Sequence, residues 1–192
     1  MSKQIHTIQS TDKEKFDDEV NLVLEYGCEL VEGSYEVIKK NDDVVYSQVI
    51  FFDDNNVMID WFSNGQIWRI GIYLDGKGSF FDYKLDGWSK EWYENGNLKS
   101  MKYYEDGELG DLTKYYENGK EEKVEHYRDG KKDREHYGNY ENGRRRFNRK
   151  YKDGELIFLK NYNNIDKDEY LDQDYLEIHF KDGEECYKKE TK

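Results

Sequence analysis

Proline and alanine are absent from the 192-residue sequence, which contains only two cysteines. Without proline, the chain lacks one of the residues that commonly keep exposed sheet edges from pairing with other chains. Cys28 and Cys186 are too far apart in sequence for a metal-binding motif or a small disulfide framework, so they are predicted to be free thiols. No apolar run is long enough to span a bilayer, and the first residues lack the features of a signal peptide. These absences predict a cytoplasmic protein without a membrane span.

Aliphatic residues are also scarce. Val, Ile, Leu and Phe make up about a fifth of the chain, close to the level typical of disordered proteins when net charge is high. Eighteen Tyr, nine Phe and four Trp supply apolar area instead, and a tyrosine can pack its ring while its hydroxyl stays in water. Together with a mean hydropathy of −1.17, this composition predicts a thin structure: an open, single-layer sheet wetted on both sides over much of its length.

The central part of the chain, residues 61–154, is organised by a recurring phrase in which an aromatic residue is followed two positions later by Asn-Gly or Asp-Gly. Each Asn-Gly glycine is followed by an Asp-Gly glycine 11 residues later, and successive Asn-Gly turns after the first are 23 or 24 residues apart. Such self-similarity indicates a repeat architecture. The copies are Phe62-Ser-Asn-Gly65, Tyr73-Leu-Asp-Gly76, Tyr93-Glu-Asn-Gly96, Tyr104-Glu-Asp-Gly107, Tyr116-Glu-Asn-Gly119, Tyr127-Arg-Asp-Gly130, Tyr140-Glu-Asn-Gly143, Tyr151-Lys-Asp-Gly154 and a late Phe180-Lys-Asp-Gly183.

Asn-Gly and Asp-Gly are typical of tight hairpin turns, because glycine, and to a lesser degree Asn and Asp, tolerates positive φ. Turns about every 11 residues leave strands of about seven to nine residues. The sequence therefore predicts a mainly β fold: a single-layer antiparallel β-meander of repeated hairpins. The turns could be two-residue type I′ turns or type I turns with a glycine bulge. The two differ by one residue in side-chain parity, so the faces of the strands stay unassigned.

The same phrases resemble a known family. Tyr-Tyr-Glu-Asn-Gly-Lys at 115–120 and the Asp-Gly turns on either side are similar to the MORN-repeat variant of bacterial YwqK-like antitoxin proteins. The resemblance covers roughly half of the chain. It implies a hairpin array and a role in toxin neutralisation through protein binding. One phrase, Tyr83-Lys-Leu-Asp-Gly87, is out of step with the repeat.

Three segments follow from this pattern. Residues 1–60 form an acidic N-terminal cap, with a short helix expected over about 12–26 behind a capping box that starts at Thr11, and with strands near 34–38, 44–52 and 56–62. Residues 61–154 form the hairpin array. Residues 155–192 hold acidic C-terminal strands near 156–159 and 175–180, separated by an acidic insertion at 161–174.

The net charge of −13 is distributed unevenly: −9 over residues 1–60, +1 over 61–154 and −5 over 155–192. Acidic ends repel nucleic acid and anionic membranes, but they attract a basic protein such as a toxin or a nuclease. Trp and Tyr dominate interface energetics, and all four tryptophans lie between 61 and 92, where they either pack the start of the array or bind a partner. The predicted partner-binding residues are Asp42, Asp43, Asp53, Asp54, Trp88, Trp92, Tyr103 and Tyr115.

No arrangement of residues predicts an enzyme, a cofactor site or a metal site. His126 and His136 follow glutamates as expected by chance in strands of alternating charge, and no nucleotide-binding or hydrolase motif occurs. The acidic run 166–174 lacks the spacing of a calcium-binding loop. The basic run 144–152 resembles a phosphate-binding patch, but in so acidic a chain it is expected to pair with acidic neighbours across the sheet. Direct binding of nucleic acid or of a small-molecule substrate is therefore not expected.

These observations favour a non-enzymatic inhibitor that binds another protein. The resemblance points to an antitoxin or immunity protein that neutralises a bacterial toxin by direct contact. The acidic composition, and a residue usage typical of AT-rich bacterial or phage genomes, suit equally well an anti-defence protein that inhibits a CRISPR effector or another host nuclease. A structural MORN-type scaffold is the alternative from a different class. Each alternative has a protein partner.

Overall fold

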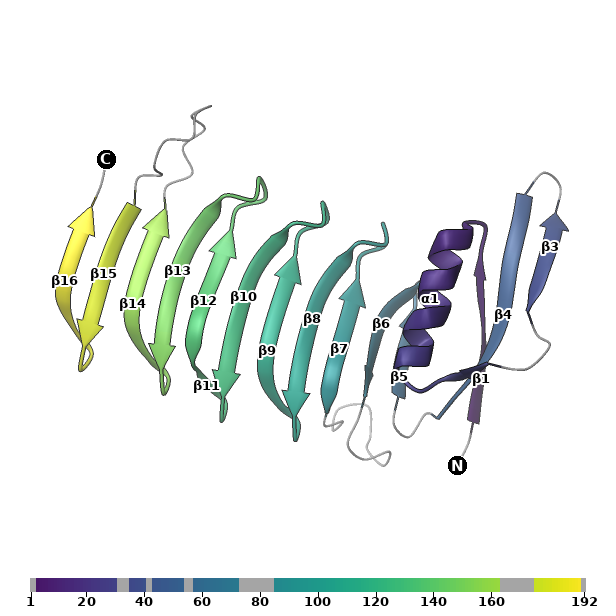
Figure 1. Cartoon of the computed structure of the whole chain (residues 1–192), viewed down its shortest axis with the longest axis horizontal. Coiled ribbons are helices and arrows are strands. Elements are labelled where there is room, and N and C mark those ends of the chain that lie inside the picture. Colours follow the sequence, from purple (N-terminus) through teal and green to yellow (C-terminus); the bar gives the residue numbers. More distant parts are fainter. Residues whose placement is uncertain are drawn as a thin grey trace. The chain divides into compact units, whose positions relative to one another are not determined.

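The computed structural model describes residues 3–30, 35–40, 43–53, 57–72, 85–162 and 175–190. It is mainly β with one short helix, as predicted, and the chain divides into two compact units, Met1–Gly96 (unit 1) and Asn97–Lys192 (unit 2). Unit 1 contains β1 (Lys3–Ser10), α1 (Lys13–Glu25), β2 (Glu29–Leu30), β3 (Glu36–Lys40), β4 (Asp43–Asp53), β5 (Val57–Trp61), β6 (Ile67–Ile72) and β7 (Gly87–Trp92) (Figure 1). The three-segment division made from composition stays a prediction.

Helix α1 begins at Lys13, one residue later than a capping box starting at Thr11 would place it. Asp12, not Thr11, is the N-cap residue, and its carboxylate accepts hydrogen bonds from the backbone N–H groups of Glu14 and Lys15 at 3.0 and 3.2 Å. The helix ends in a Schellman motif, in which Gly27 adopts a φ of +81° and the Cys28 N–H reaches the Val23 carbonyl oxygen. A carboxylate at the N-cap also interacts favourably with the positive end of the helix dipole, so an aspartate suits this position.

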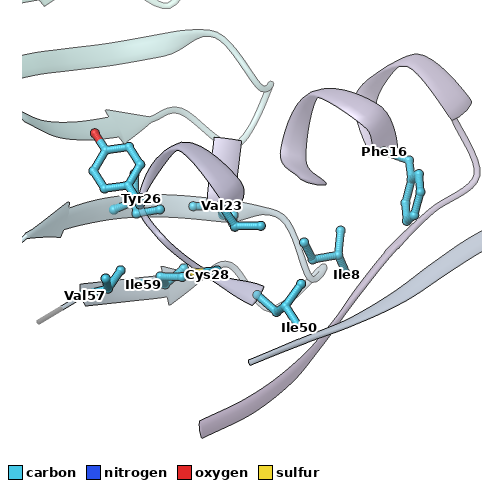
Figure 2. Close-up of a cluster of buried hydrophobic side chains, with 10 residues drawn as sticks. Ile8, Phe16, Val23, Tyr26, Cys28, Ile50, Val57 and Ile59 are labelled. Atoms are coloured by element: carbon cyan, nitrogen blue, oxygen red, sulfur yellow. The ribbon is translucent and has the colours of Figure 1, made fainter. Parts of the chain in front are cut away.

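The aliphatic core lies in unit 1. Strand β4 pairs antiparallel with β1 along one edge and with β2 and β3 along the other, and β5, β6 and β7 form a separate antiparallel run. Figure 2 shows how side chains from α1 meet those from β1, β4 and β5. The buried cluster consists of Ile8, Phe16, Val23, Tyr26, Cys28, Ile50, Val57, Ile59, Ile67 and Ile70. Burial raises the pKa of the Cys28 thiol to about 11, so Cys28 is a neutral core residue.

Unit 2 is a meander of consecutive antiparallel strands joined by short turns, visible as the arrows β8 to β16 in Figure 1. Of its described apolar side chains only Leu112 is buried, as expected for a thin sheet. The strands are β8 (Leu98–Glu105), β9 (Glu108–Tyr115), β10 (Glu121–Arg128), β11 (Lys131–Lys132), β12 (Arg134–Asn139), β13 (Arg145–Lys152), β14 (Glu155–Tyr162), β15 (Tyr175–Lys181) and β16 (Glu184–Glu190).

Both predicted turn types occur, and they alternate. In Asp106–Gly107 both residues have positive φ between the paired residues Glu105 and Glu108, which is a type I′ turn. In the Asn118 turn only Gly119 has positive φ, and the Gly119 N–H bonds to the Tyr116 carbonyl, as in a type I turn with a glycine bulge. The Asn118 Oδ1 accepts the Lys120 N–H at 3.0 Å and holds this second geometry.

The repeat length has a physical cause in unit 2. The Tyr116 hydroxyl donates to the Asn139 carbonyl at 2.9 Å, and the Tyr140 hydroxyl donates to the Tyr162 carbonyl at 3.2 Å. The Asn118 amide likewise donates to the Glu141 carbonyl at 3.0 Å. Each Tyr-Glu-Asn-Gly phrase is thus hydrogen-bonded to backbone 22 or 23 residues further along, which ties one repeat to the next without a buried apolar core.

Candidate protein-binding face

Tyr103 and Tyr115, two of the predicted binding residues, lie on one face of the unit 2 sheet. Side chains alternate along a strand, so Asp111, Thr113 and Tyr115 of β9 point to the same side. Tyr103 of β8 lies directly opposite Asp111 and shares that side. The sequence left open which side of the sheet each residue faces. The bulge at Gly110 and the turn types determine it.

Tyr137 extends this face onto β12. Val124 lies opposite both Thr113 and Tyr137, so all three point to the same side. The Tyr137 hydroxyl donates to the Glu121 carboxylate at 3.0 Å, and the Arg145 guanidinium lies over the Tyr137 ring at 3.9 Å. Burial, followed by this contact with Glu121, raises the pKa of the Tyr137 phenol. A ring held between an acid and a stacked arginine presents a fixed edge to solvent.

The face continues over the last strands through Lys160, which lies opposite Asn148, itself opposite Tyr137. Phe158, two residues from Lys160, shares its side and meets His179 edge-on at 5.0 Å. His179 in turn meets Tyr187 edge-on at 5.1 Å. Three rings from β14, β15 and β16 therefore form a row across the sheet, and Tyr187 is 48% exposed.

Two lysine side chains lie over a further ring on this side of the sheet, Tyr175. The Lys160 ammonium lies 3.5 Å from the centroid of the Tyr175 ring, and the Lys189 ammonium lies 5.6 Å from the same ring. Glu177 accepts from His179 at 2.8 Å and pairs with Lys160 at 3.5 Å. The hydrogen bond from His179 lowers the pKa of Glu177, and Lys160 adds to this effect. We call this surface the aromatic face, defined by Tyr103, Tyr115, Tyr137, Phe158, Tyr175, His179 and Tyr187.

The opposite face of unit 2 is more tightly packed and contains a polar cluster around His136. His136 is only 1% exposed, and its Nε2 donates to the His126 carbonyl at 2.7 Å, which ties β12 to β10. Burial lowers the pKa of His136 and favours its neutral form. Burial alone would raise the pKa of Glu125, but Lys123 at 2.6 Å and Lys132 at 3.5 Å lower it. A histidine this deep cannot exchange protons with a substrate, so the geometry gives it a structural role.

His126 lies opposite Asp111 and so points to the aromatic face, and its ring meets the His136 ring edge-on at a centroid distance of 6.3 Å. Its Nδ1 lies 2.7 Å from the Asp111 carboxylate, which also contacts Arg134 at 3.2 Å. Arg134 has a φ of +64°, outside the range that a non-glycine residue normally adopts. The three side chains form a surface polar network across β9, β10 and β12.

The remaining predicted residues are dispersed. Trp92 packs against the unit 1 core, whereas Trp88 is 42% exposed. Trp61 also packs against that core, so Trp61 and Trp92 have the packing role considered from the sequence, and partner binding by Trp88 stays a prediction. Asp43 and Asp53 are the first and last residues of β4, and Asp42 and Asp54 lie outside the described residues. The predicted insertion at 161–174 starts too early, because residues 161 and 162 belong to β14, and its remaining residues, 163–174, lie outside the described ranges.

The basic run 144–152 lies on β13 and finds aromatic as well as acidic neighbours. Glu135 lies opposite Lys150, as the charge argument predicts. Arg145 and Arg149, however, lie over the rings of Tyr137 and Phe147. The sequence expectation of acid pairing missed this stacking, although aromatic residues at neighbouring positions of the repeat were the available signal.

Searches for related proteins find no matching family model, no similar curated protein and no similar solved structure. The resemblance to MORN-variant repeats therefore stays a prediction. Within the described ranges, no helix has the length and apolar character needed to cross a membrane. The same ranges contain no group of three His, Cys, Asp or Glu side chains placed to hold a metal ion.

Proposed function

We propose that this chain is a non-enzymatic inhibitor that neutralises another protein by binding it on the aromatic face, in the manner of an antitoxin or immunity protein. The observation that supports this proposal most is the set of partly exposed rings on one side of unit 2, three of which, Phe158, His179 and Tyr187, meet edge-on. Aromatic side chains fixed by neighbours lose little conformational entropy on binding, and Tyr is enriched among residues that dominate interface energies.

The charge distribution suits a basic partner. Residues 1–96 carry a net charge of −10 out of −13 for the whole chain. Long-range attraction by such a surface raises the association rate, whereas contacts with the rings govern dissociation. A basic toxin or nuclease, which needs positive charge to hold its nucleic acid, is the class of protein that would be attracted and then occluded.

The test begins with affinity capture from the source organism, using the unmodified chain and two matched variants. Tyr115→Ala removes a ring from the aromatic face, and Tyr127→Ala removes a half-buried ring from the opposite face. A captured protein is then purified, and its binding and its activity are measured with each variant. We expect stoichiometric loss of the partner's activity with the unmodified chain, and a dissociation constant roughly ten- to thirtyfold higher for Tyr115→Ala.

Tyr127→Ala should leave affinity unchanged once folding has been verified by thermal melting. Equal loss of affinity in both variants would show that the aromatic face is not the binding surface. A partner that binds but keeps its full activity would contradict the inhibitor function and would favour a scaffold instead.

A further inference from the structure

Unit 1 contains a pocket that the proposed function does not use. It has a volume of about 290 Å³ and lies between α1 and the strands β6 and β7 with their turns. Pockets for drug-sized ligands start near this volume, so the space suits a single side chain. The lining residues are Lys15, Asp18, Glu19, Leu22, Gln66, Ile67, Trp92, Tyr93 and Gly96.

The chemistry of the lining is that of a cation site. Asp18 and Glu19 contribute two carboxylates from one turn of α1, and Trp92 and Tyr93 contribute aromatic rings from the end of β7. Carboxylates bind a guanidinium through paired hydrogen bonds, while aromatic rings attract the same cation through their faces. Lys15, the single basic residue of the lining, is exposed.

The partly buried position of the Glu19 carboxylate favours a cation beside it. Burial raises the pKa of its carboxyl group, and only the backbone N–H of Ile67 and the Lys15 ammonium act in the opposite direction. A partly buried carboxylate with so little compensation is stabilised when a cation enters beside it. The surrounding unit, with its net charge of −10, raises the local concentration of cations further.

We propose that this pocket binds the side chain of an arginine presented by a protein partner. Arginine fits better than lysine, because its planar guanidinium can stack on Trp92 or Tyr93 while it bonds to Asp18 and Glu19. The inference rests on the proposed function only in taking the occupant from a protein. It deepens that proposal by giving the basic partner one anchoring residue in unit 1.

The test uses a small probe, N-acetyl-arginine amide, and follows the Trp92 indole N–H signal by NMR as the probe is added to the full chain. A saturable shift is expected, with a dissociation constant on the order of millimolar, because one side chain supplies little binding energy. N-acetyl-citrulline amide, which has nearly the same shape without the charge, should give no saturable shift.

Variants sharpen the test in both directions. Asp18→Asn and Glu19→Gln should each weaken binding roughly two- to fivefold, and Lys15→Gln should strengthen it by a similar factor, since an opposing ammonium is removed. The matched control is Asp17→Asn, which removes a charge from the same helix outside the pocket lining.

Equal binding of the citrulline probe, or unchanged affinity in Asp18→Asn, Glu19→Gln and Lys15→Gln, would overturn the inference. If one carboxylate variant failed to fold, the opposite effect expected for Lys15→Gln would still decide the question. A negative result with the free probe leaves the aromatic face untouched, so failure here is distinguishable from failure of the proposed function.

Discussion

The positive φ of the turn glycines predicts that one substitution, glycine to alanine, has opposite effects at a turn position and at a nearby bulge position of unit 2. Gly119 has a φ of +81°, and a Cβ placed there would meet nothing closer than the Asn97 amide nitrogen at 3.9 Å. The cost of Gly119→Ala is therefore backbone strain alone, about 1–2 kcal/mol for an L-residue in the left-handed region. Alanine also reduces the entropy of the unfolded chain, which stabilises the folded state by about 0.4–1 kcal/mol and offsets part of that strain.

Gly110 provides the matched control, because it lies in the β9 bulge without positive φ. A Cβ at this position would be 3.5 Å from the Tyr103 ring, an ordinary van der Waals contact. Gly110→Ala should therefore raise the free energy of unfolding by about 0.4–1 kcal/mol, because it reduces the entropy of the unfolded chain and adds no backbone strain. The two variants differ by an expected 1–2 kcal/mol in the free energy of unfolding, since the strain at Gly119 is the term they do not share.

Thermal melting monitored by circular dichroism measures this difference. For a chain of this length, 1 kcal/mol shifts the melting temperature by about 2–4 °C. Gly119→Ala should melt below the unmodified protein, and Gly110→Ala at or above it. Equal shifts in the two variants would refute the assignment of strain to the Asn-Gly turns.

Three further predictions concern local packing and pH. In Gly138→Ala the new Cβ would clash with the Phe147 ring, so the free energy of unfolding should fall by about 1–3 kcal/mol, and adding Phe147→Leu should recover part of the loss in denaturant melts. Asp12→Ala should cost about 0.5–2 kcal/mol through loss of the helix cap, and Thr11→Ala should cost little; the reverse order would restore the capping box at Thr11. Because the pKa of His136 is lowered by burial, its neutral form is fully favoured above the unfolded value of 6.5, and stability should fall as pH decreases below that value. Melting temperatures from pH 7.5 to 5 should therefore fall less in His136→Gln, and an identical pH dependence would contradict this account.

The repeat phrase made the hairpins of unit 2 predictable, because Asn-Gly and Asp-Gly require positive φ at known positions. It did not reveal which turn type each dipeptide adopts, because both types place the glycine at positive φ and differ in the residue before it, where Asp106 has positive φ and Asn118 instead accepts the Lys120 N–H. Strand β16 was missed because it has no β-branched residue, and β1 was missed although it contains Ile5, Thr7 and Ile8; β1 forms against β4, and β16 forms against β15.

Of the candidate binding residues, Tyr103 and Tyr115 could be found from sequence because both belong to the regular part of the repeat. Their placement on one face could not, because the bulge at Gly110 shifts side-chain parity. The pocket in unit 1 was not predictable either. Its acidic side comes from α1 and its aromatic side from Trp92 and Tyr93, some 70 residues later, and pairing of that kind arises only when the chain folds.

The central claim, that the aromatic face of unit 2 binds a protein, is tested most directly by site-specific photo-crosslinking in the source organism. A benzophenone amino acid replaces Tyr115 in one variant and Tyr127, on the opposite face, in another. We predict that the probe at Tyr115 forms a crosslink to one protein species, identified by mass spectrometry, and that the probe at Tyr127 does not. Crosslinking of the same species from Tyr127 alone, or from neither position while the complex is intact, would contradict the claim.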